Sequence, residues 1–118
     1  MWESLLETAW EEAKPIYDEL ATDIAQQPMN IASYEVYQVW DRCLNDMWGY
    51  LRSILDAEQM QMLTDEELAW IEDKEAKVRE AGAMFLHGSL QPFMESSTAG
   101  DFTRQRVYEL WNVFQYEG

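Results

Sequence analysis

The side chains that could perform acid–base or metal chemistry in this chain are almost all carboxylates. The 118 residues include 23 Asp and Glu but only one histidine, His87, and one cysteine, Cys43. A carboxylate-bridged di-metal centre in a helical protein needs Glu-x-x-His pairs on two helices, and Met84 stands three residues before His87. The sequence also contains no calcium loop, glycine-rich phosphate-binding loop or zinc-ligand spacing. We therefore expect neither a metal nor a cofactor.

A nucleophilic mechanism is disfavoured for a similar reason. A catalytic serine or cysteine needs a general base, and His87 is the only histidine that could serve. Because Gly88 follows it, we interpret His87 as a residue at the end of a helix, close to the negative end of the helix dipole. Cys43 lies among Trp40 and Met47 at helical spacing, which is typical of a buried and inert thiol. These observations predict a protein that is not an enzyme.

Two arginines, Arg104 and Arg106, stand close together in a chain with only eight basic residues. On a helix they point about 200° apart, so one anion cannot be held by both from the same face. Arg104 shares its helical phase with Val107, so we expect it to face the interior and to pair with Asp41 or Glu75. We expect Arg106 on the surface, paired with a carboxylate of its own helix. The two arginines are thus predicted to be one internal brace and one surface charge.

Length and composition describe one strongly acidic globular domain. A chain of 118 residues can bury one core but not two, and 47% hydrophobic residues with six Trp exclude a disordered chain. The net charge of −15 disfavours nucleic acids and anionic membrane surfaces as partners. A basic protein is the partner that this charge favours, and an acidic surface that serves only solubility is an equal alternative.

The sequence pattern predicts neither a membrane-spanning helix nor a signal peptide. No apolar run approaches the ~20 residues that cross a bilayer. The first residues, MWESLLETAWEE, are acidic and amphipathic, whereas a signal peptide is basic and then apolar. We expect either synthesis without a leader or removal of a leader that precedes Met1.

Helical periodicity extends along the chain, and no period-two run or hairpin dipeptide predicts a strand. We expect a first helix from Trp2 to Ile24, with a kink or restart at Pro15 and with Pro28 closing the segment. A second helix is expected from about Ser33 to Leu55.

A third helix is expected from Thr64 to about Phe85, opened by a capping box. The fourth region contains a cluster of small residues, 96–100, that locally resembles a helix breaker. The residues before, within and after this cluster keep the same helical phase. We therefore predict a single helix from Leu90 to about Gln115, with Ser89 as N-cap and Pro92 in its first turn. Four helices with short connections predict an all-α antiparallel bundle.

Three stretches carry motifs in an order that resembles one known family. They are WDRCLNDMW (40–48), LTDEELAWIEDKEAKV (63–78), and GSLQP followed by FTRQRVYEL (88–110). They resemble the Asp-x-x-Leu-Asn, Ala-Trp-Ile and Gly-Ser-x-x-Pro…Thr-x-x-Arg segments of the lysozyme-inhibitor LprI-like family, which are small secreted or lipoprotein helical domains. The residues that stand on or beside motif positions are Asp41, Leu44, Asn45, Trp48, Ala69, Trp70, Ile71, Gly88, Ser89, Pro92, Thr103, Arg104 and Arg106.

The resemblance covers about residues 34–114 of a single domain, 1–118, and leaves residues 1–30 as an added acidic helix. We interpret eight of the motif residues as structural: Asp41, Leu44, Asn45, Trp48, Gly88, Ser89, Pro92 and Arg104. The chain departs from the family at Val78, which stands where the family places a cysteine, and near Thr98, where its partner is expected. The family's disulfide is therefore absent here.

The resemblance implies a cell-envelope protein with at least one lysozyme inhibitor among its relatives. Lysozymes are commonly strongly basic, so an acidic binder is physically sensible. We predict a non-enzymatic binding module for a basic partner, extracytoplasmic after loss of a leader, with a cytoplasmic location left open. The residues predicted to meet the partner are Glu3, Glu7, Glu11, Asp18, Glu66, Trp70 and Glu72.

Two other functions are compatible with the sequence. The first is a structural or interaction protein that self-associates through an apolar patch and does not bind lysozyme. The second is a hydrolase or ligand-binding bundle, which would require an accessible pocket lined by His87 and several carboxylates.

Overall fold

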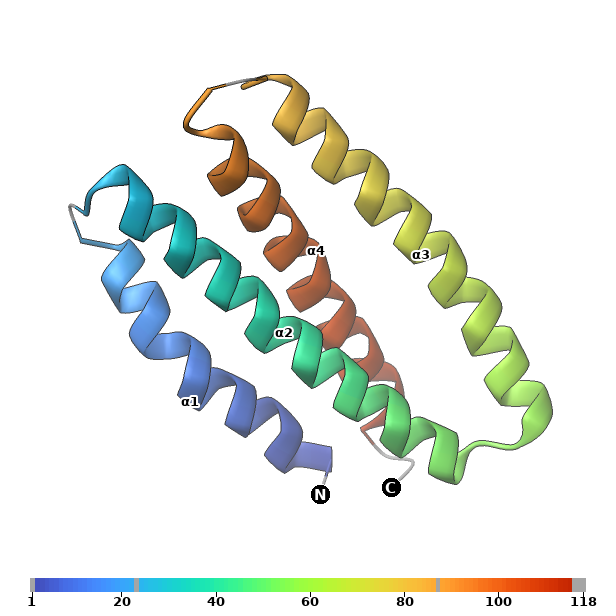
Figure 1. Cartoon of the computed structure of the whole chain (residues 1–118). Helices are drawn as coiled ribbons and strands as arrows, with labels where there is room; N and C mark the ends of the chain where they lie inside the picture. The colour runs from blue at the N-terminus through green and yellow to red at the C-terminus, as the bar shows by residue number, and fades with distance from the viewer. Residues whose placement is uncertain (1, 23, 87, 116–118) are drawn as a thin grey trace.

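A computed structural model describes residues 2–22, 24–86 and 88–115. Within these residues the chain forms helices α1 (Trp2–Leu20), α2 (Gln26–Ile54), α3 (Ala57–Ala83) and α4 (Gln91–Phe114), and the described part contains no strand. Successive helices run in opposite directions (Figure 1). The predicted all-α bundle of four antiparallel helices is confirmed. None of the helices in the described ranges is long and apolar enough to cross a membrane.

The four helices form a row rather than a closed square. α2 packs against both α1 and α4, and α4 packs in turn against α3. The molecule measures 47 × 29 × 16 Å along its principal axes, so it is long and thin. α2 and α4 form the central pair, and α1 and α3 are the outer helices (Figure 1).

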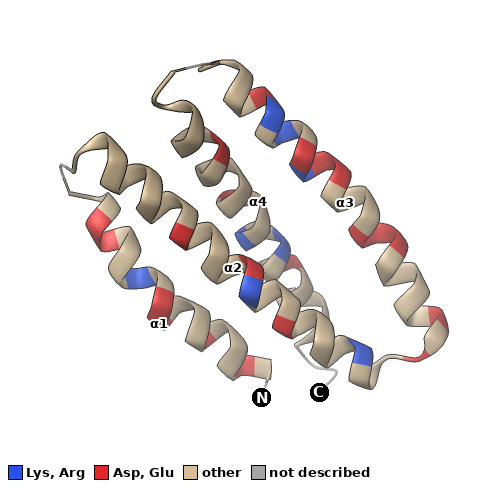
Figure 2. Cartoon of the chain, in the orientation of Figure 1, with Lys and Arg blue, Asp and Glu red and all other residues tan. Residues whose placement is uncertain are grey.

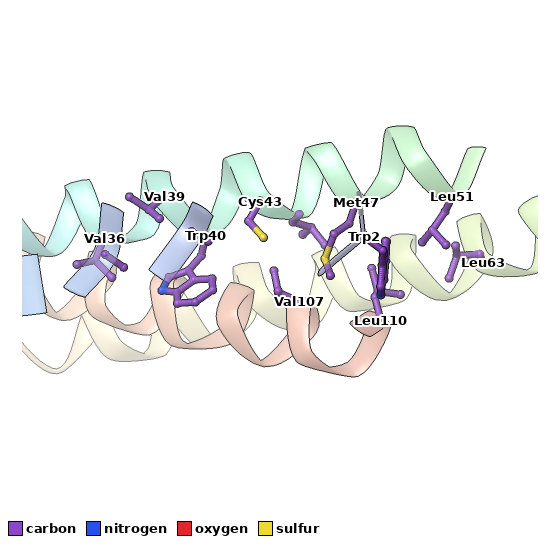
Figure 3. Close-up of a cluster of buried hydrophobic side chains, with 13 residues drawn as sticks. Trp2, Val36, Val39, Trp40, Cys43, Met47, Leu51, Leu63, Val107 and Leu110 are labelled. Atoms are coloured by element: carbon purple, nitrogen blue, oxygen red, sulfur yellow. The ribbon is translucent and has the colours of Figure 1, made fainter. Parts of the chain in front are cut away.

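The core follows the apolar stripe of α2. Trp40, Met47 and Leu51 are fully buried at helical spacing along this stripe. Val107 and Leu110 of α4 pack on the same cluster (Figure 3). Burying a large apolar side chain contributes roughly 1.5–3 kcal/mol, so this cluster is the main source of stability for the central pair.

The boundary between the first two helices differs from the prediction. α1 ends at Leu20 rather than Ile24, and it continues through Pro15 without a restart. α2 begins at Gln26, so Pro28 lies in the first turn of the second helix instead of closing the first. The first four N–H groups of a helix have no partner within it, so a proline there removes no helical hydrogen bond.

α3 begins earlier than predicted, because a different capping box opens it. Asp56 Oδ1 accepts a hydrogen bond from the Gln59 N–H at 2.8 Å, and Gln59 Oε1 accepts one from the Asp56 N–H at 3.1 Å. Thr64 lies inside α3, where its Oγ1 donates to the carbonyl oxygen of Met60 at 2.7 Å. Met60 and Leu63 pack on the core, which favours the longer helix.

The predicted fourth helix is confirmed as α4, which passes unbroken through residues 96–100. Its N-cap is Leu90, without a side-chain cap, rather than Ser89. A Cβ added at Gly100 would lie 3.6 Å from Cα of Tyr37. The small residues of this segment therefore bring α4 close to α2 instead of breaking the helix.

Candidate functional site

A groove of about 910 Å³ runs along α1 and reaches α4, and we call it the α1 groove. Most of its lining surface is apolar, and most of its charged side chains are acidic. The residues that line it are Glu3, Leu6, Glu7, Trp10, Glu11, Lys14, Pro15, Asp18 and Trp111. All four residues of α1 that the sequence predicted to meet a basic partner thus lie together at this groove.

The spacing along α1 explains the acidic edge. Glu3, Glu7 and Glu11 recur every four residues, so their side chains lie about one helical turn apart on the same side of the helix. Asp18 continues the row near the end of α1. Lys14 is the one basic side chain among the residues that line the groove. The edge therefore carries a net negative charge over most of the length of α1.

Two tryptophans, one from each helix, form the aromatic part of the groove. Trp10 Nε1 donates a hydrogen bond to the hydroxyl of Tyr108 at 2.7 Å. The Trp10 ring also meets Trp40 edge-on, with 5.0 Å between ring centroids. Trp111 lies across the groove on α4, and its buried Nε1 has no hydrogen-bond partner among the described residues. Trp10 is thus held rigidly while it faces the groove.

The other predicted partner-binding residues, Glu66, Trp70 and Glu72, lie on α3 and do not line the α1 groove. Glu66 Oε1 accepts from Arg106 Nη1 at 2.7 Å. Trp70 packs beneath Lys74, whose Nζ lies 5.2 Å from the ring centroid. The structure therefore divides the predicted partner surface between the two outer helices.

The prediction for the arginine pair is wrong about burial, because Arg106 is the buried member. The expected pairing of Arg106 with a carboxylate of its own helix, Glu109, is confirmed. Its side chain is 3% exposed. Its Nε donates to Glu67 Oε1 at 2.6 Å, and its Nη1 donates to Glu66 Oε1 at 2.7 Å and to Glu109 Oε2 at 3.0 Å. Burial lowers the pKa of Arg106, but the hydrogen bonds to the three carboxylates outweigh it, so the pKa lies above its usual value. Arg106 is therefore the brace between α4 and α3.

Arg104 is instead partly exposed, and it meets α1. Its Nη1 donates to the hydroxyl of Tyr17 at 3.3 Å, and its guanidinium lies 5.7 Å from the centroid of the Tyr17 ring. Its ion pair is with Asp101 on its own helix, at 3.8 Å, rather than with Asp41 or Glu75. The buried arc of α4 is wide because two helices cover it, and it includes position 106 rather than 104.

Several motif residues meet at a second groove, of about 250 Å³, between α2 and α3. The residues that line it are Leu44, Asn45, Trp48, Thr64, Glu67, Leu68 and Ile71. Leu44 is buried, Trp48 is half-buried and Asn45 is exposed. Leu44, Asn45, Trp48 and Ile71 therefore share one groove, and none of them lines the α1 groove.

Three further motif residues, Gly88, Ser89 and Pro92, lie at the connection between α3 and α4. The Gly88 N–H donates to the carbonyl of Phe85 at 2.8 Å, and Pro92 lies in the first turn of α4. The carbonyl oxygen of Ser89 accepts from Asn30 Nδ2 of α2 at 3.3 Å. These residues connect the helices at one end of the molecule.

No metal-binding cluster of three or more His, Cys, Asp or Glu occurs among the described residues, which leave out His87. Cys43 is buried, as predicted, and its Sγ lies 3.6 Å from the carbonyl oxygen of Leu5. Burial, and to a lesser extent Asp46 and Glu12, raise the pKa of the Cys43 thiol to about 12. The thiol is therefore protonated and unreactive at neutral pH.

The sequence did not indicate that core-type residues would line the groove. Leu6, Trp10 and Trp111 fall on apolar stripes, so the pattern assigns them to the core. Each is half-buried, with one side against the bundle and the other in the groove. An unusually high number of tryptophans was the available signal, since Trp combines apolar area with a polar N–H.

The family model described as "Lysozyme inhibitor LprI" matches residues 18–110 of the chain. The match begins in the last turn of α1, includes all of α2 and α3, and ends near the end of α4. No match was found among curated proteins or among solved structures. Because the match spans most of the chain, including the helices that form the central pair, this protein belongs to the lysozyme inhibitor LprI family.

Proposed function

We propose that this protein binds a basic, lysozyme-type muramidase, inhibits it, and receives it at the α1 groove. The observation that carries the proposal is the combination of an acidic edge with an aromatic floor in one groove. The family description and the net charge of −15 support the same kind of partner.

The two parts of the groove would act at different stages of binding. The carboxylates of Glu7 and Glu11 are exposed, so they contribute a field that attracts a basic protein and speeds association. Such surface charges add little affinity once salt screens them. Trp10 and Trp111 offer apolar area beside the charges, and buried aromatic residues commonly supply most of the energy of an interface. The groove thus suits a partner that presents Lys or Arg next to an apolar side chain.

Glu3, Glu7 and Glu11 precede the part of the chain that matches the family. We infer that the first turns of α1 supplement the family domain with additional negative charge. A non-enzymatic role and a place outside the cytoplasm, as a secreted protein or lipoprotein, belong to the same proposal, because muramidases act on the cell wall. Nucleic acids are not part of it, since the charge opposes them.

The test is a titration of lysozyme activity at low and at moderate salt. The variant pair Glu7→Gln/Glu11→Gln removes two charges from the α1 groove. The matched pair Glu72→Gln/Asp73→Asn removes two exposed charges from α3. We expect inhibition by the native protein that weakens as salt rises, a loss of about tenfold in affinity for the α1 pair, and near-native inhibition by the α3 pair.

The two variant pairs test the choice of the α1 groove as the binding site, and the native protein tests whether lysozyme is inhibited at all. Inhibition that is lost in the α3 pair and kept in the α1 pair would move the site to Glu66, Trp70 and Glu72. An absence of both inhibition and salt-sensitive binding in the native protein would overturn the proposal as a whole.

A further inference from the structure

Three of the helix ends that lie at one end of this highly charged molecule carry no charged residue. Residues 24–34 and 81–94 contain no Asp, Glu, Lys or Arg, although such residues make up 26% of the chain. The first segment leads into α2 and forms its first turns, and the second includes the end of α3 and the start of α4. These three helix ends lie at the same end of the molecule (Figure 1), and charged residues are missing from them in Figure 2. We call this region the neutral end.

The neutral end also exposes large apolar side chains. Those with more than a third of their surface exposed there are Ile31, Tyr34, Met84, Leu86 and Leu90. The most exposed is Met84, at 79%. The hydrogen bond from Asn30 to the carbonyl of Ser89 holds the start of α2 against the connection between α3 and α4. Ile31, Met84, Leu86 and Leu90 thus gather at one end of the molecule, and such patches commonly mark an interaction site. Tyr34 lies at the edge of this region, where it also lines a groove with Lys74 and Glu75.

From these observations we infer that the neutral end is a self-association surface, through which two copies of this chain meet end to end. The charge distribution selects this occupant. A basic partner is attracted to the carboxylates elsewhere on the molecule, and an anionic membrane is repelled by the net charge of −15. A second copy is repelled by the acidic faces and meets the least charge at this end.

The shape of the molecule favours the same arrangement. Electrostatic forces between proteins decay over about 8 Å at physiological ionic strength. Two copies in contact at their neutral ends extend away from each other along the 47 Å axis, whereas copies packed side by side would bring their acidic helices within about the 16 Å thickness. A two-fold contact of identical surfaces is also the commonest form of dimer.

The size of the surface sets the expected strength. A stable interface buries about 800 Å² on each partner, and the end face is limited by the two short axes of 29 and 16 Å. We therefore expect a weak, reversible dimer, as is typical of interfaces at the low end of this size range. In the sequence, carboxylates flank the two uncharged segments at Asp23, Glu35, Glu80 and Glu95, and Glu19 lies near the end of α1. Screening of their mutual repulsion makes the dimer tighter as salt rises, which is the opposite of the salt dependence expected for the α1 groove.

The experiment is analytical ultracentrifugation of the whole chain from 5 to 500 μM, at 50 and 500 mM NaCl. Met84→Glu places a carboxylate on the neutral end, and we expect it to weaken the dimer at least tenfold. The control is Met62→Glu, the same change on the same helix, at a residue that is 68% exposed near the opposite end of α3. We expect this control to dimerise like the native chain. Thermal melting of both variants verifies that each one is folded.

Each contrary result is decisive. A native chain that stays monomeric over this range overturns the inference, as does equal dimerisation by Met84→Glu and Met62→Glu. Co-flotation of a monomeric chain with neutral phosphatidylcholine vesicles would replace the second copy with a lipid surface. Lysozyme inhibition does not enter this experiment, so its outcome is independent of the function proposed above.

Discussion

The two outer helices are attached to the central pair by different kinds of contact. α1 buries Trp2, Ala9 and Ala13 against α2, and its aromatic rings reach both α2 and α4. α3 buries only Leu63 and Gly82. Its polar link to α4 is the cluster of carboxylates around Arg106. One helix is held mainly by apolar contacts and the other to a large degree by a buried charge.

This difference matters because the two kinds of contact fail differently. Apolar burial is lost in proportion to the area that is removed. In a buried ion cluster, the attraction between opposite charges offsets the large desolvation penalty of each charge. The removal of one charged side chain therefore leaves the desolvation penalty of the others uncompensated. α3 should therefore be detached by one polar substitution, whereas α1 should weaken gradually.

The largest expected effect is at Arg106, the brace between α4 and α3, which we call the α3 brace. Arg106→Ala leaves Glu67, which is 12% exposed, without its partner, and should lower the free energy of unfolding by about 3 kcal/mol. Arg104→Ala is the matched control, and it should cost less than about 1 kcal/mol because Arg104 is partly exposed. Urea denaturation measures both. Similar losses of stability for Arg106→Ala and Arg104→Ala would contradict the assignment of Arg106 as the brace between α3 and α4.

The arginine pair also shows where sequence reasoning stops. Periodicity identifies α4 as a helix and shows that Arg104 and Arg106 point apart. It does not reveal that a second helix, α3, covers part of α4, which widens the buried arc to include Arg106. The contact between α3 and α4 is tertiary, and no local signal in the sequence encodes it.

Other features divide in the same way. The acidic edge of the α1 groove was predictable, because four-residue spacing along a single helix decides it. The groove itself was not, since Trp111 comes from α4. The start of α3 was missed because two capping boxes compete, at Asp56 and at Thr64, and packing of Leu63 favours the earlier one.

The second effect, on the α1 side, is expected at a buried hydrogen bond. The Tyr17 hydroxyl accepts from Nε1 of Trp40, which is fully buried, at 3.0 Å. Tyr17→Phe leaves that N–H without an acceptor and should lower the free energy of unfolding by about 1.5–2 kcal/mol. Tyr34→Phe makes the same change on an exposed ring and should cost less than about 0.5 kcal/mol. Chemical denaturation at low protein concentration compares them, and equal losses would contradict the assignment.

The third effect is a dependence on alkaline pH at the contact between α1 and α2. The folded-state pKa of Cys43 is raised to about 12, above its unfolded value of 9.0, because burial disfavours the thiolate. The folded chain therefore holds this proton longer than the unfolded chain. The contribution of this proton to the free energy of unfolding is complete below pH 9. It falls by about 1.4 kcal/mol per pH unit as the pH rises toward 12.

The comparison with Cys43→Ala isolates this contribution from the titration of tyrosines. We expect the native chain to lose about 1.4 kcal/mol more than Cys43→Ala between pH 8 and pH 10. Denaturation midpoints at each pH supply the measurement. Parallel pH profiles would show that the thiol is already accessible to water in the folded state.

The smallest effect is expected at an ion pair that resembles the α3 brace but lies on the surface. Arg42 of α2 pairs with Glu12 of α1, and the two side chains are 60% and 45% exposed. Because water and salt screen this pair, Arg42→Ala should change the free energy of unfolding by less than about 0.5 kcal/mol, and 0.5 M NaCl should abolish the change. A loss above about 1.5 kcal/mol would mean that α1 also depends on an ionic contact. Arg42 and Arg106 each join two helices through glutamates, one on the surface and one in the interior. A comparison of the two substitutions therefore tests whether burial alone explains why the two outer helices are attached differently.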